Sequence, residues 1–177
     1  MPEKRLYETS QDQSSPNRNL APLTTQLDKN ERLMIGGCIL SDLAERYGTP
    51  LYVIDEETLR STCKAYKGAM ENYYPGNSLP IYASKANSSL VISKIIASEG
   101  LGIDVVSSGE LITALKGGIP GEKIFLHGNN KSKEEIVLGY RNGVNIVIDN
   151  KHDIQNLEEI ISPGDKPAKL MLRFTPG

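Results

Sequence analysis

Residues 82–87, Tyr-Ala-Ser-Lys-Ala-Asn, lie where a short apolar run ends and a helical pattern begins. After them, Ser88 and Ser89 precede apolar residues that recur at helical spacing through 90–96. The apolar run predicts a short buried strand that ends at Lys85, and the following pattern predicts a helix capped by one of the two serines.

A lysine at the carboxyl end of a buried strand is unusual, because an ammonium group resists losing its hydration shell. Burial lowers the pKa of such an amine and makes it a nucleophile that can form a Schiff base. The alternative is that Lys85 leaves the sheet directly into solvent. The local pattern leaves both interpretations open, and the rest of the chain favours the first.

The bulk composition excludes several classes of protein. The chain has 177 residues, with 20 Lys and Arg against 22 Asp and Glu, so its net charge of −2 gives no basic footprint for nucleic acid. No apolar run approaches the roughly 20 residues that span a bilayer. Cys38 and Cys63 lack CxxC spacing and there are 2 histidines, which predicts no metal site. We therefore expect a cytoplasmic α/β protein without a membrane or nucleic-acid partner.

The first third of the chain is irregular. Residues 1–32 are polar and show no period, which is typical of a flexible lead-in. Residues 33–40 predict a hairpin-like pair of short strands around a glycine pair. A short helix capped by Ser41 is expected over 41–47, and a strand over 51–55.

From residue 56 onward, helical and strand patterns alternate. The expected helices are at 56–73, 88–98, 108–116, 132–142 and 151–161, and the expected strands are at 80–84, 101–106, 123–127, 145–148 and 168–173. Five successive strands end at polar residues spaced 19 to 24 apart: Lys85, Asp104, His127, Asp149 and Arg173. An even βα period favours a closed (β/α) barrel over an open doubly wound sheet.

In such a barrel the active site lies at the carboxyl ends of the strands, so these polar strand ends predict a site. No GxGxxG or GxxxxGK[ST] motif follows a strand, which argues against a nucleotide-binding domain. The chain stops just after the apolar run 168–173. Because an uncovered flat edge invites aggregation, we expect these residues to be part of a longer protein.

Five motifs, in order, give a more specific indication. Across residues 33–177 the chain resembles the N-terminal part of the fold-III, pyridoxal-phosphate-dependent decarboxylases, especially the branch that acts on diaminopimelate. The matching motifs are Gly-Thr-Pro-Leu-Tyr-Val at 48–53, Tyr-Ala-Ser-Lys-Ala-Asn at 82–87, Asp-Val-Val-Ser-Ser-Gly-Glu-Leu at 104–111, His-Gly-Asn-Asn-Lys-Ser at 127–132 and Arg-Phe-Thr-Pro-Gly at 173–177.

The resemblance implies a fold and an activity. Residues 56–177 would form the first part of a (β/α)8 TIM barrel of the alanine racemase-like type, truncated after about five strands. Residues 33–55 would pack with a β-rich domain that this chain lacks. The implied reaction is decarboxylation of meso-2,6-diaminopimelate to L-lysine and CO2, with pyridoxal 5'-phosphate as cofactor, in a homodimer. Alternatives are a decarboxylase of ornithine or arginine, or a non-catalytic pyridoxal-phosphate carrier, against which the segment 33–55 argues. We expect the 177-residue chain alone to be inactive.

The resemblance also implies a role for individual residues. Lys85 would hold the cofactor covalently, Asp104 and Glu110 would be acidic groups near the cofactor and its lysine, and Arg173 would face the cofactor ring. His127, at a strand end, would line the pocket.

Each assignment beyond the lysine has a structural alternative. A strand-end Asp104 could cap the next helix, and Glu110 could close a capping box with Ser107. His127 could be a structural histidine, and Arg173 could form an ion pair with a strand-end carboxylate such as that of Asp104.

Overall fold

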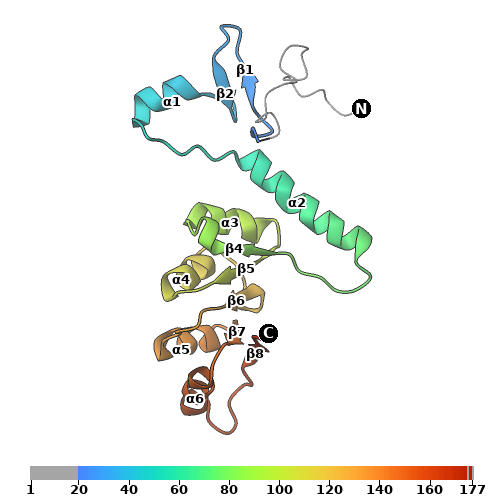
Figure 1. Ribbon diagram of the computed structural model, residues 1–177, viewed down its shortest axis with the longest axis vertical. Helices are drawn as coiled ribbons and strands as arrows, with labels where there is room; N and C mark the ends of the chain where they lie inside the picture. Colours follow the sequence, from blue (N-terminus) through green and yellow to red (C-terminus); the bar gives the residue numbers. More distant parts are fainter. Residues whose placement is uncertain (1–19, 175, 177) are drawn as a thin grey trace. The chain divides into compact units, whose positions relative to one another are not determined.

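The computed structural model describes residues 20–174 and residue 176, so most of the expected lead-in, and Thr175 and Gly177 of the last motif, lie outside the described residues. The chain divides into two compact units at Lys64 and Ala65. Each unit is described by itself below, with its elements labelled in Figure 1.

The first unit holds a small antiparallel sheet in the order β1-β2-β3, with strands at Gln26–Leu27, Leu33–Ile35 and Cys38–Ile39. The predicted hairpin is confirmed, and its turn uses Gly36 and Gly37 at φ values of 58° and 76°, a region that glycine enters without steric cost.

Strand β1 was not predicted, because a polar pair of residues has no alternation to detect. The expected irregular lead-in is therefore wrong at Gln26–Leu27. The cause is a turn organised by Asp28, whose Oδ1 atom accepts hydrogen bonds from the N–H groups of Asn30 at 2.8 Å and Arg32 at 2.9 Å. This turn returns the chain so that Leu27 pairs with Leu33.

Helix α1 spans Leu40–Tyr47, close to the prediction, but its N-cap is Ile39 and no side chain caps it. The Ser41 cap was therefore wrong: Ser41 lies inside the first turn.

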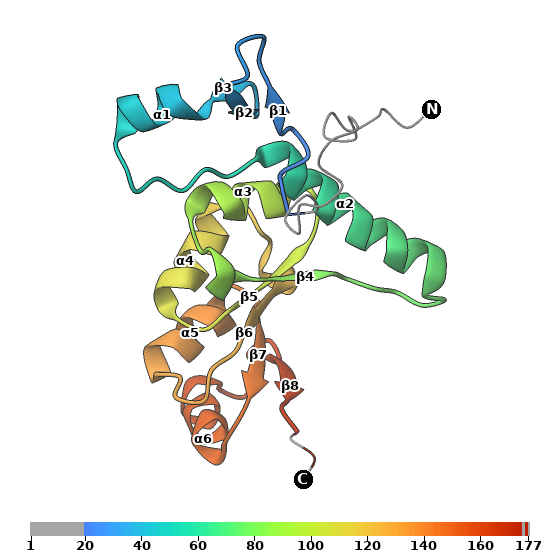
Figure 2. The ribbon, with the colours of Figure 1, turned by 45° about the horizontal axis from the view of Figure 1, so that its top comes forward.

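The predicted strand at 51–55 does not form either, and Tyr52 is 97% exposed. Figure 2 shows this segment as an extended connection between α1 and α2. No strand among residues 20–174 pairs with it, and a strand needs a partner for its main-chain hydrogen bonds.

Helix α2, Glu56–Tyr73, has the bounds that the sequence predicted and runs across the junction between the units. The second unit then alternates strand and helix, as expected. Its strands are β4 Ile81–Ala83, β5 Gly102–Val105, β6 Ile124–Leu126, β7 Asn145–Ile148 and β8 Lys169–Leu172, and its helices are α3 Leu90–Ser98, α4 Ser108–Lys116, α5 Lys133–Arg141 and α6 Lys151–Ile160, with short 3-10 turns η2 Ser84–Ala86 and η3 Gly121–Lys123.

All five strands are parallel and lie in sequence order, β4-β5-β6-β7-β8. A doubly wound sheet reverses its strand order at a switch point, and its helices cover both faces. Here the order does not reverse, and helices α3 to α6 lie on one side of the strands in both views (Figures 1 and 2). The predicted partial (β/α) barrel is confirmed.

The core of this unit lies between the sheet and the helices. Alternate strand residues such as Ile103, Val105 and Leu126 are at most 1% exposed and face the helix layer, whereas Asp104, between the first two, is half-buried on the opposite face. Strand β8 forms within the apolar run 168–173, but all of its residues are exposed, including Leu172 at 80%. Within residues 20–174 it pairs with β7 alone, so its other edge is uncovered.

Candidate active site

The polar strand-end residues fall at one edge of the second unit. Because the strands are parallel and adjacent, their carboxyl ends point the same way, and the loops that follow them meet at that edge. The five predicted residues do lie at this edge: Lys85, Asp104, His127, Asp149 and Arg173.

Lys85 lies in the 3-10 turn η2, directly after β4. The pairing of β4 with β5 sets Ala83 opposite Asp104, and Asp104 Oδ1 accepts a hydrogen bond of 3.2 Å from the N–H of Ser84. A carboxylate is thus attached to the backbone of the turn that carries the lysine.

The side chain of Lys85 is exposed, so the burial predicted from its position after a buried strand is wrong for this chain. The reason is that β4 is an edge strand among the described residues, with Ile81 44% exposed. The amine of Lys85 has no hydrogen bond or ion pair with any described residue, and so it is free to react.

Asp104 does not cap a helix. The N-cap of α4 is Ser107, whose hydroxyl accepts the N–H of Glu110 at 3.3 Å. The capping alternative for Asp104 is therefore wrong, and its carboxylate stays at the strand edge.

Glu110 has a local structural contact. Its Oε2 atom accepts the N–H of Val106 at 2.7 Å, which joins the start of α4 to the end of β5. This resembles the capping box expected from the sequence, except that the glutamate bonds Val106 and not Ser107 itself. A further carboxylate, that of Glu135, accepts the N–H of Ser108 at 2.8 Å and links the starts of α4 and α5.

His127 follows β6 and is half-buried, and its backbone N–H donates to the carbonyl of Val105 at 2.8 Å. This bond continues the sheet by one residue and sets the ring at the same edge as Asp104. The structure therefore agrees with a position beside the other candidates.

Arg173 pairs with a strand-end carboxylate, but not the expected one. Its Nη1 atom lies 3.0 Å from Oδ1 of Asp149, and its backbone N–H bonds the carbonyl of Ile148. The suggested pairing with Asp104 is wrong, because β7 and not β5 neighbours β8.

Sequence reasoning missed the ion pair between Lys131 and Asp153, whose Nζ and Oδ2 atoms lie 2.8 Å apart. Lys131 belongs to the motif at 127–132, but nothing local indicates its partner. The spacing of Asn150 and Asp153 was the available signal, since an Asn followed three residues later by an acid is a helix start.

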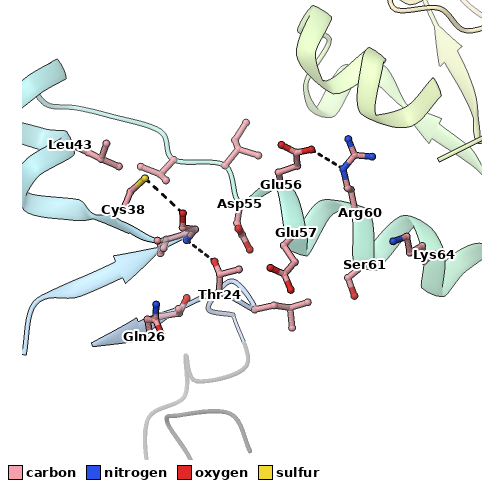
Figure 3. Close-up of a pocket in the computed structure, with 17 residues that line it drawn as sticks. Thr24, Gln26, Cys38, Leu43, Asp55, Glu56, Glu57, Arg60, Ser61 and Lys64 are labelled. Atoms are coloured by element: carbon pink, nitrogen blue, oxygen red, sulfur yellow. Dashed lines mark hydrogen bonds and ion pairs between the residues drawn. The ribbon is translucent and has the colours of Figure 1, made fainter. Parts of the chain in front are cut away.

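A cavity of about 1260 Å³ in the first unit is a separate feature. Figure 3 shows Asp55 among its lining side chains, with an ion pair of 2.8 Å between Arg60 and Glu56. Burial opposes the ionisation of Asp55, but hydrogen bonds from Thr58 and Thr24 outweigh it and hold the pKa of this carboxyl below its usual value. None of the candidate residues lines this cavity, so its size does not make it the active site.

Residues 20–174 hold no cluster of three or more His, Cys, Asp or Glu that could bind a metal ion. None of the helices described is both long enough and apolar enough to cross a membrane.

The edge of parallel strands presents Lys85, whose amine has no partner among residues 20–174, in a turn bonded to the carboxylate of Asp104. Such an amine is what a protein that holds an aldehyde cofactor needs. Residues 56–177 match the family described as "Pyridoxal-dependent decarboxylase, pyridoxal binding domain", and the chain therefore belongs to this family.

Individual relatives carry a more specific name. The chain is 44% identical over 171 residues to a diaminopimelate decarboxylase of Synechocystis, covering 92% of this chain and 36% of the relative. A crystal structure of the diaminopimelate decarboxylase of M. jannaschii superposes with a TM-score of 0.79 at 33% identity, covering 86% of this chain and 36% of that one. The same enzyme in complex with L-lysine superposes with a TM-score of 0.71 at 35% identity. This match covers 77% of this chain and 32% of that one. The chain thus spans about a third of the length of these relatives.

Proposed function

We propose that this protein catalyses the pyridoxal-phosphate-dependent decarboxylation of meso-2,6-diaminopimelate to L-lysine and CO2, and that Lys85 is the residue that binds the cofactor. The observation that carries the proposal is the position of Lys85, which follows β4 in a turn whose backbone is bonded to Asp104. Its amine has no partner among residues 20–174. The names of the relatives at 33–44% identity support the choice of substrate.

The residues at the edge fit a pyridoxal phosphate group. An amine without an ion-pair partner among residues 20–174 is available to bond an aldehyde, as a cofactor lysine must be. When bound, the cofactor supplies an electron sink for the negative charge left by the departing CO2.

The chain's own residues would hold and orient the reacting groups. Lys85 binds the cofactor and takes up or releases a proton at Nζ. Asp104 is fixed by its bond to the Ser84 N–H, one residue before Lys85, and so keeps a carboxylate at the turn that carries the amine. A carboxylate held by backbone costs little reorganisation during the reaction.

The remaining candidates have supporting roles in this proposal. Arg173, whose Nη1 lies 3.0 Å from Asp149 Oδ1, would face the cofactor ring. His127 lines the site after β6. Glu110 bonds the Val106 N–H and acts on the site through the start of α4, without contact with the reacting atoms.

The proposal also includes a small-molecule amino acid as substrate, a cytoplasmic location, a homodimer and no nucleic-acid partner. The names of the relatives support the amino-acid substrate, and the net charge of −2 supports the expectation of no nucleic-acid partner. The domain assignment belongs here too: residues 56–177 form the pyridoxal-binding barrel part, and 33–55 pack with a β-rich domain. The family match that begins at residue 56 supports the first boundary.

The proposal is tested by covalent labelling. We expect borohydride reduction of the native-length protein with pyridoxal phosphate to leave a pyridoxyl group on Lys85. Lys94 is the matched control, because it is also an exposed lysine of the same unit but lies on α3, away from the strand ends. Label on Lys94 in place of Lys85 would overturn the assignment.

A further inference from the structure

Lys131 and Asp153 form an ion pair inside the second unit. Their side chains are each 1% exposed, and Nζ lies 2.8 Å from Oδ2. Lys131 lies in the loop between β6 and α5, whereas Asp153 lies in the first turn of α6. Two charges withdrawn from water carry a desolvation penalty that their attraction often only offsets.

The pair is not arranged for stability alone. Oδ1 of Asp153 is buried and has no hydrogen-bond partner among residues 20–174, although a buried acceptor left unsatisfied costs about 1–3 kcal/mol. Apolar side chains of similar shape would avoid both penalties. A contribution to stability alone therefore does not explain this ion pair.

Lys131 and Asp153 each make a further hydrogen bond to the backbone of a strand-end loop. Lys131 Nζ donates to the carbonyl of Gly128 at 2.5 Å, and Asp153 Oδ2 accepts the backbone N–H of Asp149 at 3.0 Å. Gly128 directly follows His127, and Asp149 holds Arg173. One buried pair thus joins the backbones of two strand-end loops, and each loop carries a candidate residue of the site.

A second contact ties the same two loops. The side-chain amide of Asn150 donates to the carbonyl of Asn129 at 3.1 Å. The loop after β6 and the start of α6 therefore form one hydrogen-bonded block at the edge of the sheet.

We propose that Lys131 and Asp153 are positioning residues for the cofactor site: by bonding Gly128 and Asp149 they hold His127 and the Asp149–Arg173 pair in place. This inference rests on the proposed function, since it names which buried groups orient that site. Neither residue contacts the reacting atoms in this role.

The test compares single and double variants of the native-length protein. Lys131→Met leaves the Asp153 carboxylate buried without a partner, so we expect a lower melting temperature of the cofactor-free protein and weaker binding of pyridoxal phosphate. Lys131→Met combined with Asp153→Asn removes both charges at nearly constant volume. We expect this double variant to recover its melting temperature while its dissociation constant for pyridoxal phosphate stays raised by about tenfold, because Gly128 still lacks its donor.

The control is Lys133→Met, which removes an exposed ion pair of 2.6 Å between Lys133 and Glu159. We expect it to change neither quantity, because exposed pairs contribute little.

Two results would overturn the inference. In the first, the double variant recovers both its melting temperature and its affinity for pyridoxal phosphate. The ion pair would then contribute to stability only, and not to positioning of the cofactor site. The other is a Lys131→Met variant that matches the wild type in both. Should the double variant remain unfolded, hydrogen exchange at the Asp149 amide of Lys131→Met, compared with Lys133→Met, decides the question.

Failure of the proposed function is recognised separately. It would appear as absence of the pyridoxyl label on Lys85 in the wild type. Hydrogen exchange at the Asp149 amide of the cofactor-free protein still tests the positioning in that case. Exchange faster in Lys131→Met than in Lys133→Met supports the inference, and equal exchange contradicts it.

Discussion

Asp104 accepts the backbone N–H of Ser84 through Oδ1 at 3.2 Å, one residue before Lys85. The bond follows from the register of two neighbouring parallel strands, which sets Ala83 opposite Asp104. A carboxylate on β5 therefore organises the turn that ends β4. In the proposed enzyme this carboxylate has two roles, as an acceptor for the turn and as a charge beside the lysine.

The two roles of Asp104 separate in the variant Asp104→Asn. The amide oxygen can still accept the Ser84 N–H, so we expect an unchanged melting temperature. Loss of the charge should slow decarboxylation by about 10- to 100-fold and should shift the pH profile of the bound cofactor's absorbance. Steady-state rates and a spectroscopic pH titration of the native-length protein check this. Unchanged rate and titration together would leave Asp104 with the structural role only.

Much of this edge could be predicted from the sequence, because βα alternation is a local signal. The run before Lys85 and the helical spacing after it indicated strand and helix without knowledge of neighbours. The position of Asp104 on β5 followed from the same even period, and the structure has both residues at one edge.

The predictions that were wrong depend on pairing partners that are distant in the sequence, which local patterns do not reveal. The segment 51–55 has the composition of a strand but lacks a pairing partner among the described residues, and β1 has a partner but no strand-like composition. The exposure of Lys85 reflects the edge position of β4. The Lys131–Asp153 pair joins two loops that are distant in sequence, and Arg173 pairs with Asp149 because β8 neighbours β7.

Asp55 gives the first unit an acid-dependent contribution to stability. Its carboxylate accepts hydrogen bonds from the N–H and hydroxyl of Thr58, and these bonds outweigh burial and lower its pKa below the usual 3.8. A depressed pKa in the folded state means that the stabilisation is present above the unfolded value of about 3.9 and is lost as the pH falls through the lower folded value.

We therefore expect Asp55→Asn to destabilise the chain at pH 7 and to make a smaller difference at a pH below the lowered pKa of the wild-type carboxyl, where that carboxyl is also protonated. Thermal unfolding of residues 1–177 followed by circular dichroism at both pH values measures this. Glu45→Gln is the control, since Glu45 is an exposed acid of α1 and should have no such effect. An equal loss of stability at both pH values would show that the charge of Asp55 is not responsible.

Gly121 allows a close approach between η3 and the turn after α5. A Cβ atom at this position would lie 1.8 Å from the carbonyl oxygen of Asn142, so the backbone must move to accept any side chain. We expect Gly121→Ala to lower the free energy of unfolding by about 2–4 kcal/mol. In Gly68→Ala, within helix α2, the new methyl group meets nothing within 4 Å, and we expect a gain of about 0.5–1 kcal/mol. Urea unfolding of both variants provides the comparison, and similar values for the two would contradict the proposed close approach.

The last prediction concerns the 177-residue chain taken alone, which we expect to show no measurable decarboxylase activity. The described sheet has five parallel strands, fewer than the closed (β/α)8 ring, and the outer edge of β8 is uncovered with Leu172 80% exposed. Lys85 is likewise exposed, so water reaches the site. Electrostatic stabilisation is strong only where donors and charges are held in a site that excludes water, and positioning of the substrate fails with the same opening. The experiment adds pyridoxal phosphate to residues 1–177 and follows CO2 release from meso-diaminopimelate, with Lys85→Ala and free pyridoxal phosphate as controls. Steady turnover that exceeds both controls would show that five strands suffice for the reaction, and the closed barrel would then not be needed to activate Lys85.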